Sequence, residues 1–242
     1  MADVLAFGAH PDDVEIGCGG TVALLAKQGR DVIVVDFTRG ETGTRGTPDQ
    51  RAAEAVEAAR ILGARTRVNL ELPDGLLPFT DPKSGRPTRE LAAERVVDLI
   101  REHRPRLLLA NFPSDAHPDH VVVGEVVKQA RYLAGLQKWR AGKARHRPDL
   151  VLQYFEHEQH EPSLLVDVSA VYPQKLAAIR CFRSQLHDPK SQELDTALSR
   201  PDFLERREAR DRFFGTVAGV THAEPFFLIG PPKIADPFSL LP

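Results

Sequence analysis

The sequence predicts a single α/β domain with a mostly parallel, doubly wound sheet. Strand and helix signals alternate through the first 135 residues, which is typical of this class. The strand signals are nearly continuous apolar runs, such as residues 4–9 and 32–35, and such runs indicate parallel strands covered on both faces. A length of 242 residues suits one domain of this kind, so we expect residues 1–242 to form one unit.

The first half of the chain contains four strand signals and four helix signals. The segment 48–62 is rich in Ala with mixed charges and ends before Gly63, a residue typical of helix C-termini. Pro105 ends the helical pattern of residues 87–103. We expect strands at 4–9, 31–38, 67–72 and 106–111, and helices at 21–28, 48–62, 87–103 and 120–135.

Beyond Trp139 the alternation changes, beginning with a basic, loop-like stretch at 138–148. This C-terminal α/β extension should finish the sheet and shape the substrate cleft. We expect strands at 150–155 and 164–168, helices at 172–185 and 203–217 on either side of a polar stretch at 186–201, and a tail that begins at Pro231-Pro232.

Composition excludes several classes of function. The net charge is −2 and there is no block of Lys and Arg, which argues against a nucleic-acid or anionic membrane surface. No apolar stretch approaches the roughly 20 residues of a membrane span, and the N-terminus lacks the pattern of a signal peptide. We therefore expect a cytoplasmic protein. Cys18 and Cys181 are too few for a disulfide framework and too isolated for a thiolate metal site.

The most informative motif is His10-Pro11-Asp12-Asp13, directly behind the first apolar run. Burying two carboxylates and an imidazole costs several kcal/mol unless a cation or hydrogen bonds compensate. A divalent metal ion is the simplest compensation. The alternative is structural, with His10 as a hydrogen-bonded core residue and Asp12 or Asp13 as a helix N-cap.

A second motif, Asp115-Ala116-His117-Pro118-Asp119-His120, follows the apolar run 107–110 and adds ligands of the kind that zinc accepts. In the commonest doubly wound order, strands one and four are neighbours, and ligands bind beyond their carboxyl ends. The two motifs would therefore converge on one crevice. Alternatively, His117 and His120 simply share the face of a polar helix start, and Asp119 caps that helix.

Two other patterns are weaker. His157 and His160 are one residue too close for a His-Glu-x-x-His zinc motif, so we interpret this stretch as a solvated loop. Gly17-Cys18-Gly19-Gly20 does not fit the spacing of a dinucleotide-binding loop, and Asp12 and Asp13 would repel a pyrophosphate. We expect these glycines to let the following helix approach the metal loop closely.

The Gly-rich polar stretch 38–47 follows the second strand at the same end of the sheet. It is a candidate substrate-binding loop, with a flexible surface loop as the alternative. Arg51 begins the helix behind it and could make a charge-assisted contact with substrate, or could be an ordinary solvated charge.

These motifs together resemble the zinc-dependent N-acetylglucosaminyl deacetylases of the LmbE-like (PIG-L) family. The resemblance covers residues 4–135 and weakens toward the C-terminus. Within the family, Thr44-Arg45-Gly46-Thr47 and residues 70–75 are most similar to the bacillithiol-biosynthesis branch, which deacetylates GlcNAc-malate. The motifs that carry the family resemblance are Ala9-His10-Pro11-Asp12-Asp13 with Gly19-Gly20, Thr38-Arg39-Gly40-Glu41, and His117-Pro118-Asp119-His120.

By position, the resemblance implies a Rossmann-like fold in which His10, Asp13 and His120 bind Zn²⁺ and Asp12 is the general base. Three protein ligands leave zinc an open position for water, whose pKa falls to about 7. Asp12 can then take the proton of that water.

The resemblance also implies that His117, oriented by Asp119, stabilises the oxyanion or protonates the leaving amine. The sequence leaves open whether His117 or Asp12 delivers that proton. Arg51 matches the position of a substrate-contacting arginine of the branch. The chain departs from the branch at Ala116, where an Arg commonly precedes the His-Pro-Asp-His motif.

The sequence thus predicts a cytoplasmic zinc-dependent hydrolase that acts on a small-molecule GlcNAc conjugate, with neither nucleic acid nor membrane as a partner. Relatives of the branch are often homo-oligomers, frequently hexamers, which the resemblance implies here as well. Two alternatives remain. One is an amidase acting on thiol-sugar conjugates, and the other is a nucleotide- or sugar-binding protein without catalysis.

Overall fold

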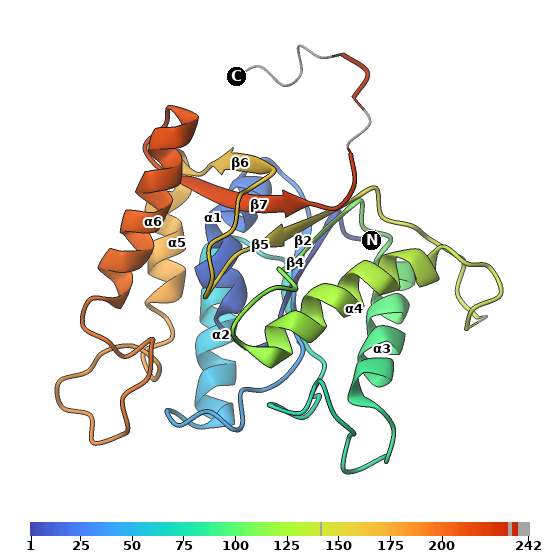
Figure 1. The fold of residues 1–242 in the computed structure, drawn as a ribbon, viewed down its shortest axis with the longest axis horizontal. Coiled ribbons are helices and arrows are strands. Elements are labelled where there is room, and N and C mark those ends of the chain that lie inside the picture. Colours follow the sequence, from blue (N-terminus) through green and yellow to red (C-terminus); the bar gives the residue numbers. More distant parts are fainter. Residues whose placement is uncertain (141, 232–233, 237–242) are drawn as a thin grey trace.

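Five parallel strands form the larger part of one mixed, seven-stranded sheet in the computed structural model, which describes residues 1–140, 142–231 and 234–236 (Figure 1). The strand order is β3-β2-β1-β4-β5-β7-β6, and β7 runs antiparallel to both of its neighbours. The strands are β1 (Val4–Gly8), β2 (Val32–Asp36), β3 (Thr66–Asn69), β4 (Leu107–Asn111), β5 (Leu150–Tyr154), β6 (Leu164–Asp167) and β7 (Ala223–Leu228).

Helices cover both faces of this sheet, as expected for a doubly wound fold (Figure 1). Alternate residues of β1 point to opposite sides: Leu5 and Phe7 pack with α3 and α4, whereas Val4 and Ala6 pack with α1, α2 and α5. The helices are α1 (Asp13–Lys27), α2 (Pro48–Leu62), α3 (Thr88–His103), α4 (Pro118–Ala134), α5 (Tyr172–Ile179) and α6 (Phe203–Ala218), with a short 3-10 turn, η1 (Ser169–Val171).

The predicted α/β class is confirmed, and six of the seven strands lie where the sequence places them. The seventh, β7, was not predicted; it contains Pro225, and proline is unusual inside an interior strand. Pro225 pairs only with Leu165 of β6, while the register with β5 runs from Phe226 to Leu228. The predicted helix at 172–185 is too long, since α5 ends at Ile179. Pro232, the second proline of the expected tail, lies outside the described residues.

The first helix begins at Asp13, eight residues before its predicted start, so the glycine-rich segment is part of the helix. The helix is kinked at Cys18, where φ is −145° and ψ is 22°. Beyond the kink, the buried Glu224 carboxylate accepts hydrogen bonds from the amides of Gly20 and Thr21 at 2.8 and 2.7 Å. A side chain at Gly17 would overlap the Tyr154 ring, so this glycine allows α1 to lie close to β5.

The sheet order reverses at β1, whose neighbours are β2 and β4. The pairs Val4 with Leu107 and Ala6 with Leu109 hold β1 and β4 in parallel register, so their carboxyl ends lie side by side. This confirms the predicted pairing of β1 with β4, on which the predicted crevice depends. Both His/Asp motifs begin at the carboxyl ends of these two strands.

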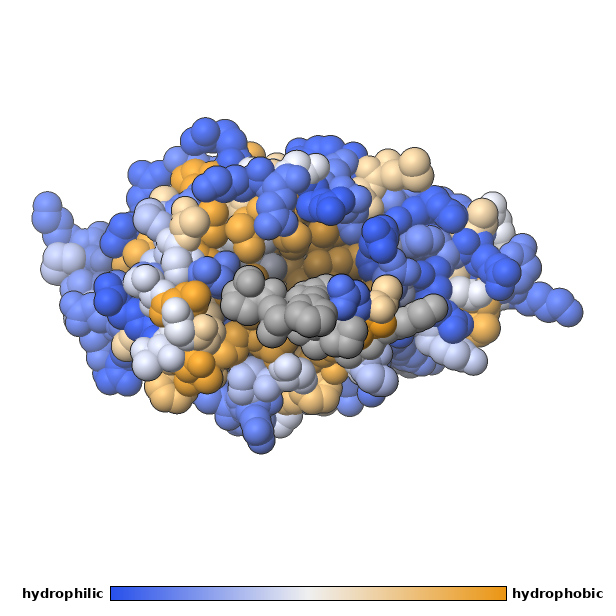
Figure 2. All heavy atoms as spheres, turned by 90° about the horizontal axis from the view of Figure 1, so that it is seen from above, coloured by the Kyte–Doolittle hydropathy of each residue, from blue (hydrophilic) through white to orange (hydrophobic). Residues whose placement is uncertain are grey.

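Hydrophilic side chains cover much of the outline of the molecule viewed from above, while apolar side chains gather toward the middle of that face (Figure 2). Within the described part of the chain, every helix is too short or too polar to cross a membrane.

Candidate metal centre and catalytic pocket

The first motif forms a tight turn between β1 and α1. The buried Asp13 carboxylate accepts hydrogen bonds from the amides of Ala9 and His10, at 2.8 and 3.1 Å. Asp12, the residue before α1, has φ of 121°, a conformation that non-glycine residues rarely adopt. Such strain persists only where surrounding structure enforces it, and it is concentrated at functional sites. The turn therefore directs the two neighbouring carboxylates to different partners.

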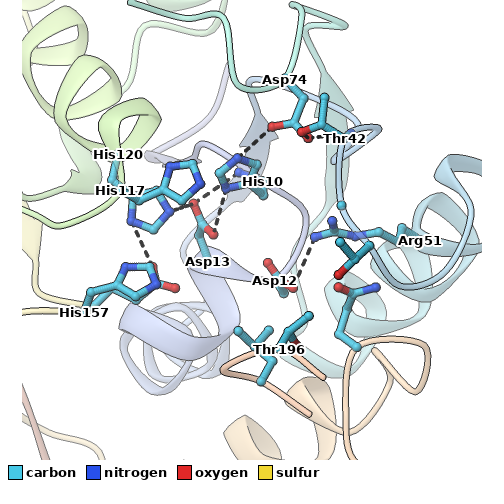
Figure 3. A pocket seen from close by; sticks show the side chains of 15 residues that line it. His10, Asp12, Asp13, Thr42, Arg51, Asp74, His117, His120, His157 and Thr196 are labelled. Atoms are coloured by element: carbon cyan, nitrogen blue, oxygen red, sulfur yellow. Dashed lines mark hydrogen bonds and ion pairs between the residues drawn. The ribbon is translucent and has the colours of Figure 1, made fainter. Parts of the chain in front are cut away.

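The second motif carries two imidazoles to the same place from the start of α4 (Figure 3). The ring centroid of His10 lies 4.7 Å from that of His117 and 5.5 Å from that of His120. Asp13 lies between two of these rings, with Oδ1 3.6 Å from His10 Nδ1 and Oδ2 3.3 Å from His120 Nε2. The three residues predicted to bind zinc are thus neighbours, and all three are buried.

Charges at this centre depend strongly on one another. Burial alone would lower the pKa of His10 and His120, but Asp13 and other nearby carboxylates raise both well above the usual range. Burial would raise the pKa of Asp13, but His120 and His10 hold it well below its usual range. The carboxylates thus stabilise two positive charges here. A divalent cation supplies the same charge, and the imidazole and carboxylate donors are ligands that zinc accepts.

Four groups of three His, Asp or Glu residues have ligand atoms within 4.8 Å of one another in the described part of the chain. Each group contains His10 or His120, so the four groups lie next to one another around these two imidazoles. The His120 Nδ1 and Glu156 Oε2 atoms are buried and make no hydrogen bond in the described structure, although oxygens of Asp115 and Glu156 lie 3.3 and 3.9 Å from His120 Nδ1. The groups are His10–His117–His120, Asp115–His120–His157, His10–Asp74–Asp119 and Asp13–His120–Glu156.

Asp12 faces away from the imidazoles and toward α2. Its Oδ2 lies 3.2 Å from Nη2 of Arg51, which also donates to the Pro11 carbonyl at 2.7 Å. Burial raises the pKa of Asp12 to about 7, while Arg51 opposes that rise. A carboxylate that titrates near neutral pH is suited to general-base catalysis. Arg51 lines the pocket, but the contacts of its guanidinium include the general-base candidate itself.

His117 and Asp119 contact each other through the backbone. The Asp119 amide donates to His117 Nδ1 at 3.2 Å, so neutral His117 carries its proton on Nε2. The Asp119 carboxylate instead accepts from the amides of Gly75 and Leu77, at 2.8 and 3.2 Å. Burial and the neighbouring His10 and His120 lower the pKa of His117, which favours its neutral form. The catalytic roles of His117 and Asp119 stay predictions.

The centre lies in a cavity of about 320 Å³, bounded by segments that are distant in sequence (Figure 3). Thr42 and Thr44 from the polar loop line one wall, and Thr196 and Leu198 from the C-terminal extension line another. Arg45 of the polar loop is buried and joins these walls, donating to the carbonyls of residues 184, 186 and 194. The loop is thus anchored to the opposite wall of the pocket.

Sequence reasoning missed acidic residues beside the centre. Asp74 Oδ1 lies 3.0 Å from His10 Nε2, and Asp115 Oδ1 lies 3.3 Å from His120 Nδ1. Glu156 is buried in the same pocket, and burial together with Asp13 raises its pKa to about 7. Asp115 belongs to the second motif and Asp74 to the stretch 70–75 that resembles the branch, so the sequence held a signal for both, whereas nothing local distinguishes Glu156.

The loop predicted for His157 and His160 is confirmed, but the two side chains have different environments. His157 lines the pocket, its Nδ1 lies 2.9 Å from Asp115 Oδ1, and its ring centroid lies 4.9 Å from that of His120. His160 packs outside the pocket against Phe112, with Nε2 2.9 Å from the carbonyl of Ser114. His157 is thus a pocket residue rather than only a solvated one.

Comparison with known proteins identifies the family. Residues 5–131 match the family model PIG-L, described as GlcNAc-PI de-N-acetylase. Diacetylchitobiose deacetylase of Thermococcus kodakarensis is 34% identical over 197 residues, which cover 75% of this chain and 69% of that protein. A probable N-acetyl-α-D-glucosaminyl L-malate deacetylase 2 of Bacillus cereus is 28% identical, covering 75% of this chain and 83% of that protein.

The similarity extends to a solved structure and to a protein of different activity. The conserved protein TT1542 from Thermus thermophilus is 35% identical with a TM-score of 0.83, covering 98% of this chain and 99% of its own. The 4-oxalmesaconate hydratase of Pseudomonas putida is 27% identical, covering 76% of this chain and 74% of that protein. The fold and the matched sequence together show that this chain belongs to the PIG-L family of deacetylases.

Proposed function

We propose that this chain removes the acetyl group from an N-acetylglucosamine conjugate in a zinc-dependent hydrolysis. The observation that carries the proposal is the placement of Asp13 between His10 and His120, with the strained Asp12 beside it at the base of an open pocket. One aspartate faces the candidate metal ligands, and the other is a separate base. This division of roles is what hydrolysis of an amide by an activated water requires.

His10, Asp13 and His120 would hold the ion, which when bound supplies Lewis acidity toward the acetamide carbonyl and lowers the pKa of water. Asp12 would accept the proton of the attacking water, since its pKa of about 7 is suited to that task near neutral pH. His117 would donate from Nε2 to the carbonyl oxygen as negative charge develops there. The newly protonated Asp12 can then protonate the leaving amine, whereas neutral His117 would have to become an imidazolate to do so.

GlcNAc-malate is the first candidate substrate. Its support is the resemblance of residues 44–47 and 70–75 to the bacillithiol branch, together with the Bacillus cereus relative. Malyl carboxylates can pair with arginines of the cleft, and that binding energy can serve the transition state. Diacetylchitobiose is the second candidate, supported by the Thermococcus kodakarensis relative with 34% identity.

The test is incubation of the zinc-loaded protein with GlcNAc-malate, free GlcNAc and diacetylchitobiose, with free amine and acetate both measured. We expect acetate release, with the largest kcat/KM for GlcNAc-malate. Equal rates for GlcNAc-malate and GlcNAc would contradict the malate assignment but not deacetylation. Cleavage of a thiol-conjugate amide in preference would favour the amidase alternative. A zinc-loaded protein that releases no acetate from any of these would contradict the proposed function.

A further inference from the structure

A second cavity, of about 380 Å³, opens beside the catalytic pocket. The two cavities share Glu156, His157 and Leu198 in their linings, so they meet along one boundary. The second cavity is formed largely by the loop before α6 and by the first two turns of that helix. A molecule with its acetamide at the metal centre could therefore extend past His157 toward α6.

The lining of this second cavity is strongly basic. It contains Arg200, Arg206, Arg207 and Arg210, and one acidic residue, Glu156. Three of the four guanidinium groups are paired with carboxylates nearby. Arg200 and Arg206 lie 3.0 and 2.6 Å from Asp202, and Arg210 lies 2.9 Å from Asp211.

Arg207 differs from the other three because it has no carboxylate within ion-pair distance among the described residues. Its Nη1 donates to the backbone carbonyl of Glu156 at 2.8 Å, and its guanidinium lies 5.3 Å from the centroid of the Phe203 ring. Its Nε and Nη2 atoms donate to no other group in the described structure. Burial and the neighbouring Arg210 lower the pKa of Arg207, and the more distant carboxylates of Glu156, Asp211 and Asp115 offset this only in part.

The remaining walls are apolar. Ile16 and Phe203 belong to a small apolar cluster that joins α1 to α6, and Leu198 lies at the boundary with the catalytic pocket. An organic group with a short carbon chain and a terminal anion would match such a lining. A guanidinium binds carboxylate and phosphate oxygens through two parallel N–H groups, and Arg207 has such groups available.

We propose that this cavity is an anion subsite, in which Arg207 binds a carboxylate or phosphate on the part of the substrate attached to the acetylated sugar. The inference rests on the proposed deacetylation and gives its substrate class, an acidic conjugate rather than a neutral chitooligosaccharide. Arg207 acts on binding and specificity, at a distance from the reacting bond.

The test compares selectivity in the zinc-loaded wild type, Arg207→Gln and Arg207→Lys. GlcNAc-malate and GlcNAc 1-phosphate serve as acidic substrates and diacetylchitobiose as the neutral one. We expect Arg207→Gln to lower the ratio of kcat/KM for the better acidic substrate to that for the neutral one by roughly 10- to 100-fold, the usual effect of losing a charged hydrogen-bond pair. Arg207→Lys should restore part of the ratio, because it keeps the charge.

The matched control is Arg212→Gln, on the same helix, where the exposed Arg212 pairs with Glu208 at 2.9 Å outside the cavity. It should leave the ratio unchanged. The acidic substrate whose kcat/KM falls more in Arg207→Gln identifies the anion that Arg207 binds. An unchanged ratio in Arg207→Gln, or an equal fall in Arg212→Gln, would overturn the proposal.

A binding measurement keeps this test separate from the proposed function. Malate and inorganic phosphate are titrated into each zinc-loaded protein by calorimetry, without any sugar. We expect at least one anion to bind the wild type and Arg212→Gln with the same affinity and Arg207→Gln at least roughly tenfold more weakly. If no acetamide is hydrolysed but this difference is found, the proposed reaction fails while the subsite stands. Equal affinities in all three proteins would overturn the subsite itself.

Discussion

Arg51 donates to the Asp12 carboxylate at 3.2 Å, and both side chains are buried at the edge of the catalytic pocket. The sequence predicts a substrate contact for this arginine, whereas its guanidinium is already engaged with Asp12 and with the carbonyls of Pro11 and Gly40. The Arg51–Asp12 pair therefore links a residue predicted to bind substrate to the pKa of the candidate general base. A role for Arg51 in tuning Asp12 and a role in binding substrate make different predictions.

Replacing Arg51 with Gln removes the cation that partly offsets the effect of burial on the pKa of Asp12. The pKa of Asp12, about 7, should then rise, because its charged form loses a favourable partner. A base must be deprotonated to act, so the rising limb of kcat/KM against pH should move upward by roughly one unit. Arg65→Gln is the matched control, since Arg65 pairs with Asp31 away from the pocket. An unmoved limb with a higher KM for acidic substrates would instead support direct substrate binding.

The double variant His157→Ala, His160→Ala should keep its full zinc complement. Asp13 lies between His10 and His120, while His157 pairs with Asp115 and His160 packs outside the pocket. Elemental analysis gives the zinc stoichiometry, and His10→Ala serves as the variant that should lose metal. Loss of zinc from the double variant would assign the ion to the Asp115–His120–His157 group instead.

Arg45→Met should loosen the wall of the pocket opposite the polar loop. The buried Arg45 donates to three backbone carbonyls of residues 184–194, and its own carbonyl accepts from Gln185 at 2.7 Å. Leaving those carbonyls without a donor should lower the free energy of unfolding by about 2–4 kcal/mol. Hydrogen exchange of residues 184–199 should increase. The exposed Arg183 offers a control, Arg183→Met, and equal exchange in both variants would contradict this role.

Asp211→Asn tests a buried ion network beneath α6. Asp211 lies 2.7 Å from Lys175 and 2.9 Å from Arg210, and Lys175 also lies 2.7 Å from Glu224, which caps the second part of α1. Leaving the buried cations without this partner should lower the free energy of unfolding by about 3–5 kcal/mol. Denaturant unfolding measures the change. An effect below about 1 kcal/mol would show that the network contributes little.

Asp211→Asn should also change how the free energy of unfolding depends on pH in the acidic range. Burial alone would raise the pKa of Asp211, but Lys175 and Arg210 hold it below the usual value. A lowered pKa in the folded state gives stability that is present above the unfolded pKa of about 3.9 and lost as the pH falls toward the folded value. The wild type should therefore lose more stability than Asp211→Asn below about pH 5.

Much of the sheet was predictable because it follows from local patterns. The runs 4–9, 31–38 and 106–111 are apolar enough to identify parallel strands, and the known preference in strand order placed β1 beside β4. The convergence of His10 with His120 follows from that order. Residues about a hundred positions apart could thus be assigned to one site from the sequence.

Other features depend on contacts that no local pattern encodes. Gly17 and Gly20 made residues 13–20 resemble a loop, but tertiary contacts with Tyr154 and Glu224 favour a kinked helix there. The strand β7 contains Pro225 and is stabilised by its position between β5 and β6. Glu156 and Asp74 enter the pocket from distant segments, so only the folded chain shows that they lie beside His10 and His120.

We expect the two neighbouring aspartates to have different roles, and the variants Asp12→Asn and Asp13→Ala separate those roles. Bound zinc and single-turnover acetate release are measured on both proteins in parallel, with circular dichroism as a check of folding. Asp13→Ala should lose zinc, and its activity with it, because Asp13 contacts both His10 and His120.

Asp12→Asn should retain zinc while its rate falls by roughly 10²- to 10⁴-fold, the usual effect of losing a general base. A metal-free Asp12→Asn protein, or an Asp13→Ala protein that holds zinc normally and still turns over, would reverse the roles assigned to the two aspartates.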